Sequence, residues 1–105
     1  MSLKGKKLGI LVSAAPQLRS FDHAVFTAEA ALEKGVTVYL YCIDDAVPGV
    51  DDPRLQRLRG SGLILYACAY GAQKRGMTLH DRAVFAGLTV VNDLIAGTDR
   101  FLSFN

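Results

Sequence analysis

The chain has 105 residues, which is the usual length of one domain. Its 12 Lys and Arg residues against 10 Asp and Glu leave a net charge of +2, too weak a field to favour nucleic acid or an anionic membrane as a partner. With 50% hydrophobic residues the chain is not intrinsically disordered, and its longest apolar runs fall far short of the ~20 residues of a membrane span.

We expect residues 1–105 to form a single domain, with residues 1–7 as a disordered start or one carried over from an expression vector. Lys4, Lys6 and Lys7 precede only a short apolar stretch, so we expect no secretion signal. The two cysteines are too few for a disulfide scaffold, and no Cys or His pair has zinc-ligand spacing. We therefore expect a cytoplasmic protein with free thiols and no bound metal.

The first half of the chain begins with a strand and a helix. Residues 8–12 are apolar and predict a strand covered on both faces, followed by a loop over 14–20. A helix is predicted from there, with Ser20 as its N-cap, Gly35 as its stop, and one apolar stripe made of Phe21, Val25, Ala28 and Leu32. Phe26 lies off that stripe, either under a loop or against another subunit.

The rest of the chain alternates between apolar strand-like runs and short helical patterns. The pattern first predicts a strand at 36–42 and a polar loop at 44–52. A helix is then expected to start at Asp51 or Asp52, before Pro53, and to be broken at 60–62. After it the pattern predicts a strand at 63–68, a helix at 69–75 ended by Gly76, a helix at 88–95 and a strand at 101–104. This alternation predicts a three-layer α/β/α domain with a mainly parallel sheet.

In an open sheet of this kind, ligands and reacting groups gather beyond the carboxyl ends of the strands. Those ends correspond to residues 13–15, 42–47 and 68–75, and both cysteines, Cys42 and Cys68, lie there. No glycine-rich phosphate-binding motif follows the first strand, so we expect no nucleotide and no other cofactor.

Cys68 is the better candidate nucleophile because it stands where a strand turns into a helix. Backbone N–H groups and the positive end of a helix stabilise a thiolate there, and Lys74 and Arg75 follow about two turns later. A free cysteine is also among the most buried residue types, so position alone leaves function and core packing equally open.

The segment from Cys68 to Gly76, CAYGAQKRG, resembles the C-x-x-x-A-x-x-R-G segment of the DsrE/DsrF-like sulfur-relay family, whose members include the Tus sulfur carriers. The segments 13–16, 36–47 and 87–104 are similar to further parts of the family pattern, in the same order. Ala46 stands where the family has the glycine of Asp-Gly-Val, so we expect that loop to differ in shape.

The resemblance implies the same α/β fold and a role in intracellular sulfur trafficking. Cys68 would accept sulfane sulfur as a persulfide from a donor protein and pass it to a cysteine of an acceptor protein. The N–H groups of 69–71, beginning at Ala69, would stabilise the sulfur anion, and Tyr70 and Gly71 would shape access to it. Arg75 would contact the sulfur or, more simply, pair with the last carbonyls of its helix or with an acid, and His80 would carry a proton or contact an anion. The resemblance also implies a homo-oligomer, a trimer or hexamer.

Two other functions stay open, and whether the protein is an enzyme stays open with them. In one, the chain is a non-catalytic subunit or a module that binds a small ligand or a partner, and Cys68 is buried and inert; slow alkylation of the thiol would favour it. In the other, Cys42 and Cys68 form a redox pair, which requires their two strand ends to be adjacent and which a disulfide after mild oxidation would favour.

Overall fold

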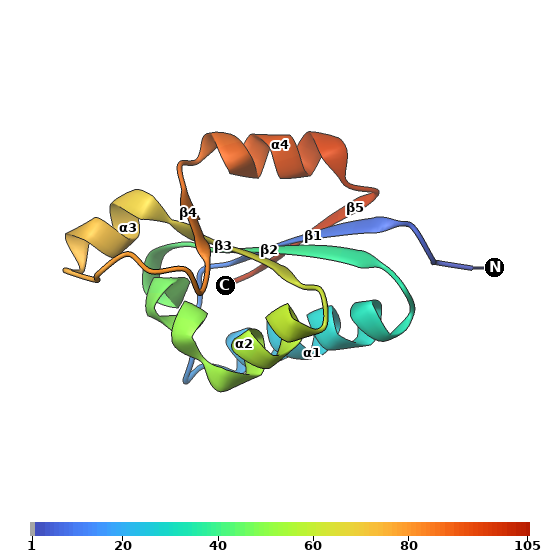
Figure 1. The fold of residues 1–105 in the computed structure, drawn as a ribbon, viewed down its shortest axis with the longest axis horizontal. Coiled ribbons are helices and arrows are strands. Elements are labelled where there is room, and N and C mark those ends of the chain that lie inside the picture. Colours follow the sequence, from blue (N-terminus) through green and yellow to red (C-terminus); the bar gives the residue numbers. More distant parts are fainter. Residues whose placement is uncertain (1) are drawn as a thin grey trace.

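Five parallel strands form the centre of the molecule, and helices cover both of their faces (Figure 1). The computed structural model describes residues 2–105. Its elements in chain order are β1 (Lys7–Val12), α1 (Arg19–Glu33), β2 (Thr37–Cys42), the 3-10 helix η1 (Asp44–Asp51), α2 (Pro53–Gly60), β3 (Ile64–Cys68), α3 (Ala69–Lys74), β4 (Val84–Ala86), α4 (Thr89–Gly97) and β5 (Arg100–Phe104). The predicted three-layer α/β domain is confirmed.

The strand order in the sheet is β4-β3-β2-β1-β5, and every neighbouring pair is parallel. β2 is the central strand, and β1 lies between β2 and β5, where its Ile10 is opposite Leu40 of β2 and Leu102 of β5. The edge strand β4 was not predicted from the sequence. It has only three residues, which is too short to show an alternating pattern.

The two faces of the sheet are covered unequally. α1 and α2 lie against one face, and α4 lies over the other (Figure 1). The first face carries the larger buried cluster, in which strand residues such as Ile10, Val38 and Leu40 pack against helix residues such as Val25 and Leu55. The second face has a smaller cluster that includes Tyr41, Cys68 and Leu94. Cys68 therefore lies on the more thinly covered face of the sheet.

The helix predicted after the first strand forms, but its start differs from the prediction. α1 begins at Arg19 with Leu18 as N-cap, so the prediction of Ser20 was wrong. The backbone closes the first turn without a side-chain cap, because the Phe21 N–H binds the carbonyl of Leu18 at 3.1 Å. Gly35 ends the helix as predicted, with a φ of +80° that suits glycine.

The expected buried stripe of α1 is confirmed for Phe21, Val25 and Ala28. Phe26 is 57% exposed, so it does not lie under a loop. No helix among residues 2–105 is long and apolar enough to cross a membrane.

Residues 44–51 form η1, so the prediction of a polar loop there was wrong. Three aspartates, at positions 44, 45 and 51, make the segment read as polar, yet Ala46, Val47 and Val50 between them are buried. Gly49 allows the close contact with α1, because a Cβ at this position would lie 2.5 Å from Cε2 of Phe21. Apolar residues inside the segment therefore hold it against the core.

The start of the chain runs beside β2. Lys7 belongs to β1, the Gly5 N–H donates to the carbonyl of Gly35 at 3.2 Å, and the carbonyl of Lys6 accepts from Thr37 at 2.9 Å. These backbone contacts are the physical reason that residues 5–7 follow the sheet. Met1, part of the start expected at 1–7, lies outside the described residues.

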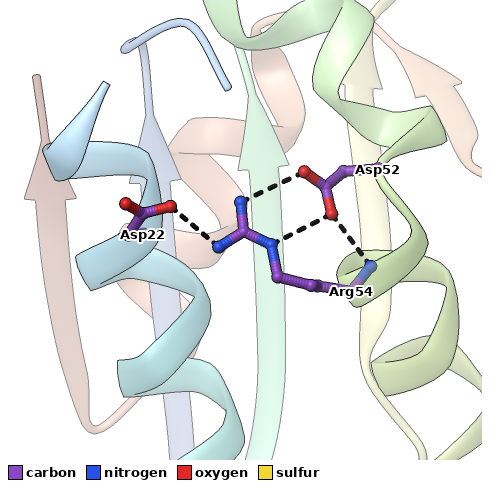
Figure 2. A network of polar contacts seen from close by, with 3 residues as sticks. All are labelled: Asp22, Asp52 and Arg54. Carbon is purple, nitrogen blue, oxygen red and sulfur yellow. Dashed lines mark hydrogen bonds and ion pairs between the residues drawn. The ribbon is translucent and has the colours of Figure 1, made fainter. Parts of the chain in front are cut away.

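An ion-pair network joins α1 to α2 (Figure 2). Of the two aspartates predicted to start α2, Asp52 is the N-cap, and its Oδ1 accepts from the backbone N–H of Arg54 at 2.9 Å. The Arg54 guanidinium binds Asp52 through Nε and Nη2, both at 3.1 Å, and reaches Asp22 of α1 at 2.7 Å through Nη1. One arginine thus holds two helices together over the same face of the sheet.

Replacing Asp52 with alanine is expected to lower the free energy of unfolding by about 1–2 kcal/mol at neutral pH, because the cap of α2 and the Arg54 contacts are lost together. Burial acts to raise the pKa of Asp52, but hydrogen bonds from the side chain and backbone of Arg54, and its charge, outweigh burial and hold the pKa below its ordinary value. A carboxyl with a lowered pKa stabilises the fold above its unfolded-state pKa of about 4, and this contribution is lost as the pH falls through the folded-state value.

Urea unfolding at a series of pH values from neutral to acid measures both effects. Asp52→Asn is the matched control, because asparagine also caps helices but does not titrate, so its stability should fall less steeply in acid than that of the unsubstituted protein. Parallel acid dependences for the two proteins would contradict the assigned role of the Asp52 carboxylate.

Candidate functional site

Cys68 stands at the carboxyl end of β3, where the chain turns directly into α3. It is the N-cap residue of α3, and its Sγ accepts a hydrogen bond from the backbone N–H of Gly71 at 3.4 Å. The residue is 7% exposed. The strand-to-helix turn predicted from the sequence is therefore present, with one backbone donor directed at the sulfur.

The thiol opens onto a cavity of about 440 Å³ at this end of the sheet. Its walls come from the end of β2, from η1, from α3 and from the segment before α4, and consist of Ile43, Asp44, Cys68, Tyr70, Gly71, Lys74, Arg75 and Leu88. Cavities of this size accommodate small molecules or the tip of a peptide. The carboxyl edge of the sheet is thus the place where a nucleophile and open space occur together.

A second cavity, of about 390 Å³, lies at the opposite edge of the sheet, where β1, β2 and β5 begin. Leu3, Leu8 and Val36 make much of its wall, with lysine and arginine side chains at Lys6, Lys7 and Arg100. It contains neither a cysteine nor a histidine. The Cys68 cavity holds a thiol, so we take it as the candidate site.

Three of the predicted supporting residues, Tyr70, Gly71 and Arg75, line the cavity with Cys68. Tyr70 is 71% exposed at its wall, and Gly71 is buried, where a Cβ would lie 3.1 Å from Cγ2 of Val47. Ala69, the first residue of α3, is half-buried and does not belong to the lining.

Arg75 has the structural contacts that its place at the end of a helix predicts. Its Nη1 donates to the carbonyl of Gly71 at 3.3 Å, and its Nη2 lies 3.3 Å from Oδ1 of Asp45. The side chain therefore links α3 to η1 beside the cavity. Its charge is shared with Asp45, whereas Lys74 has no ion-pair partner among residues 2–105.

His80 lies apart from the cavity, so the structure does not bring this predicted supporting residue to Cys68. Its Nδ1 accepts from the Arg82 N–H at 3.0 Å, and its Nε2 is 3.2 Å from Oδ1 of Asp51, without the alignment of a hydrogen bond. Its ring meets Phe85 edge-on at 5.2 Å. These contacts hold the imidazole against the end of η1. The separation of His80 from Cys68 along the sequence does not indicate this position.

Tyr41 of β2 is a residue of the site that the sequence analysis missed. Its side chain is fully buried in the cluster that contains Cys68, and its hydroxyl donates to the carbonyl of Ala86 at 2.9 Å. Burial raises the pKa of Tyr41, and the neighbouring Cys68 raises it further. The phenol therefore stays protonated beside the sulfur. The sequence shows only a tyrosine in a strand and does not show which residue of the next strand lies beside it.

Cys42 is separated from Cys68 by the sheet itself. Cys42 lies opposite Ala67 in the β2–β3 register and packs in the cluster under α1 and α2, whereas Cys68 packs in the cluster on the other face. Burial raises the pKa of the Cys42 thiol far above its ordinary value. Since neighbouring residues of a strand point to opposite faces, this arrangement opposes a disulfide between the two cysteines and disfavours the redox pair.

The five-stranded parallel sheet with helices on both faces matches the DsrE-like α/β fold of a solved structure. The structure superposes on the YchN protein of Escherichia coli, which has this fold, with a TM-score of 0.83, covering 94% of this chain and 99% of that one at 21% sequence identity. It also resembles BT1422, a conserved protein of unknown function from Bacteroides thetaiotaomicron, with a TM-score of 0.77 and coverage of 94% and 95% at 15% identity. These likenesses establish the fold.

No family model matches the chain, and no curated protein sequence is significantly similar to it. The fold expected from the sequence is thus supported by three-dimensional similarity. A function has to be argued from the residues of the site.

Proposed function

We propose that the protein carries sulfane sulfur as a persulfide on Cys68 and passes it to a cysteine of a partner protein. The observation that supports the proposal most directly is that a cysteine at the carboxyl edge of a DsrE-like sheet opens onto a cavity while its sulfur accepts a backbone N–H. Similarity to YchN in fold is consistent with sulfur relay. The proposed setting is the reducing cytoplasm, where unpaired thiols persist.

The proposed reaction is thiol–persulfide exchange in two steps. The Cys68 thiolate attacks the outer sulfur of a donor persulfide, a bond forms between Sγ and that sulfur, and the donor's S–S bond breaks to release a donor thiolate. In the second step an acceptor thiolate attacks the outer sulfur on Cys68, and the Cys68 thiolate leaves. One sulfur atom moves in each step, and no external oxidant or reductant is required.

The cavity residues have roles that follow from charge and geometry. The Gly71 N–H already points at the sulfur and stabilises negative charge on it. Lys74 lines the cavity and has no ion-pair partner among residues 2–105, so its side chain is available for an anionic donor. Arg75, in contrast, is engaged by Asp45. Tyr70, exposed at the wall, offers an aromatic surface to the donor or acceptor segment.

The proposal is tested by intact-mass measurement after incubation with thiosulfate or polysulfide. The unsubstituted protein and Cys42→Ala are expected to gain the mass of one sulfur atom, and a reductant should remove it. Cys68→Ser is expected to gain none, because serine lacks the attacking sulfur. A gain retained in Cys68→Ser, or no gain in any form, would contradict the assignment.

A second candidate function is a non-catalytic module in which the cavity binds a small ligand or a partner. The observation that favours it is the low exposure of Cys68, which is 7%. The two functions differ in the reactivity of the thiol, since a module of this kind requires no accessible sulfur.

A further inference from the structure

The side chain of Tyr41 is buried in the same cluster as Cys68. Its hydroxyl donates to the carbonyl of Ala86 at 2.9 Å. Ala86 is the residue opposite Cys68 in the β3–β4 register, so the carbonyl and the sulfur are neighbours on adjacent strands. Tyr41 itself comes from β2, on the other side of β3 from Ala86. Its side chain therefore crosses over β3, the strand that ends at Cys68, to reach that carbonyl.

A phenol has one hydrogen to donate, and this limits what Tyr41 can do. That hydrogen points at the carbonyl of Ala86, so the sulfur receives no hydrogen bond from Tyr41 while the thiol is neutral. A thiolate has no hydrogen and needs donors. Once Cys68 loses its proton, the favourable arrangement has the Tyr41 hydrogen turned toward the sulfur.

We propose that Tyr41 is a positioning residue whose hydroxyl turns from the Ala86 carbonyl to the Cys68 sulfur when the thiolate forms, and so favours the reactive form of the nucleophile. This inference rests on the proposed sulfur-carrier function. Together with the Gly71 N–H, the turned hydroxyl gives the thiolate two donors from two different elements. The Ala86 residue is half-buried, so water can take over its carbonyl.

The thiol proton leaves through the cavity to solvent, and Tyr41 does not remove it. The raised pKa of Tyr41 keeps the phenol protonated, which makes it a donor and not a base. The other titratable groups that face Cys68 are Asp44 of η1 together with Tyr70, Lys74 and Arg75 of α3 and its C-cap. β4 and the segment before α4 contribute Ala86 and Leu88, which do not titrate.

The test is the rate of alkylation of Cys68 by iodoacetamide as a function of pH, read on the Cys68 peptide by mass spectrometry. Tyr41→Phe removes the hydroxyl and keeps the ring. We expect the midpoint of the pH profile to move upward by about one unit, so that alkylation at neutral pH becomes about tenfold slower. Tyr66→Phe is the matched control. Tyr66 stacks on Tyr41 with ring centroids 6.4 Å apart, and this substitution removes a phenol hydroxyl from the same face of the sheet. Its profile should be unchanged.

A merely structural loss in Tyr41→Phe would loosen the site and raise alkylation at every pH without moving the midpoint. An unchanged midpoint, or an equal shift in Tyr66→Phe, would overturn the proposal. If Tyr41→Phe does not fold, 3-fluorotyrosine at position 41 keeps the hydroxyl and makes it a stronger donor, so the midpoint should move downward. No shift there would overturn the proposal as well.

These outcomes are independent of sulfur loading. Alkylation needs no sulfur donor, so a protein that takes up no sulfur can still show or lack the Tyr41 effect. Conversely, normal persulfide formation with an unshifted profile in Tyr41→Phe would leave the carrier function standing and remove only the role of Tyr41.

Discussion

Phe21→Ala is expected to lower the free energy of unfolding by about 3–5 kcal/mol, a large part of the ~5–15 kcal/mol that holds a typical domain folded. Phe21 is 1% exposed in the first turn of α1, where it packs against the core and against Gly49 of η1. The Arg54 guanidinium lies 5.7 Å from the centroid of its ring. Alanine would leave a cavity between α1 and η1 and remove this cation–π contact as well.

Phe26→Ala makes the same chemical change on the same helix and serves as the control. Phe26 is 57% exposed, so its loss should change the free energy of unfolding by no more than about 0.5 kcal/mol. Urea unfolding followed by circular dichroism measures both variants. Similar losses for the two would show that the buried contacts of Phe21 do not carry the difference.

The fold was predictable because two periods alternate along the chain. Residues 8–12 are apolar without a break, as a strand covered on both faces requires, and Phe21, Val25 and Ala28 recur at helical spacing. η1 could not be predicted in this way, since the aspartates at its ends dominate a segment of eight residues. Its helical form depends on burial of Val47 and Val50 against elements that are distant in sequence.

The sequence could place only those site residues whose position follows from the end of a single strand. Cys68 could be placed at the carboxyl edge because the position of β3 along the chain determines it. Tyr41 could not, since its contact with Cys68 depends on the order and register of β2, β3 and β4. His80 follows α3 closely in sequence, but the chain carries it to Asp51 and Phe85, so the structure does not bring it to Cys68.

Alkylation of the native protein is expected to be at least about a thousandfold faster at Cys68 than at Cys42. Cys42 is fully buried under α1 and α2, and burial raises the pKa of its thiol, so the reagent reaches a thiolate there only after the fold opens. Opening that costs about 5 kcal/mol or more leaves fewer than roughly one molecule in a thousand reactive at a time. Cys68 lines an open cavity, so its sulfur is reachable without unfolding.

The measurement is a time course of iodoacetamide labelling, with each cysteine followed on its own peptide. In denaturant both thiols should react at similar rates, which shows that the native difference comes from the fold. Labelling of Cys68 as slow as that of Cys42 would mean that the cavity does not admit even a small electrophile. A donor persulfide would then be excluded too, because transfer requires its outer sulfur to touch Sγ, and the binding module would be the better account of the site.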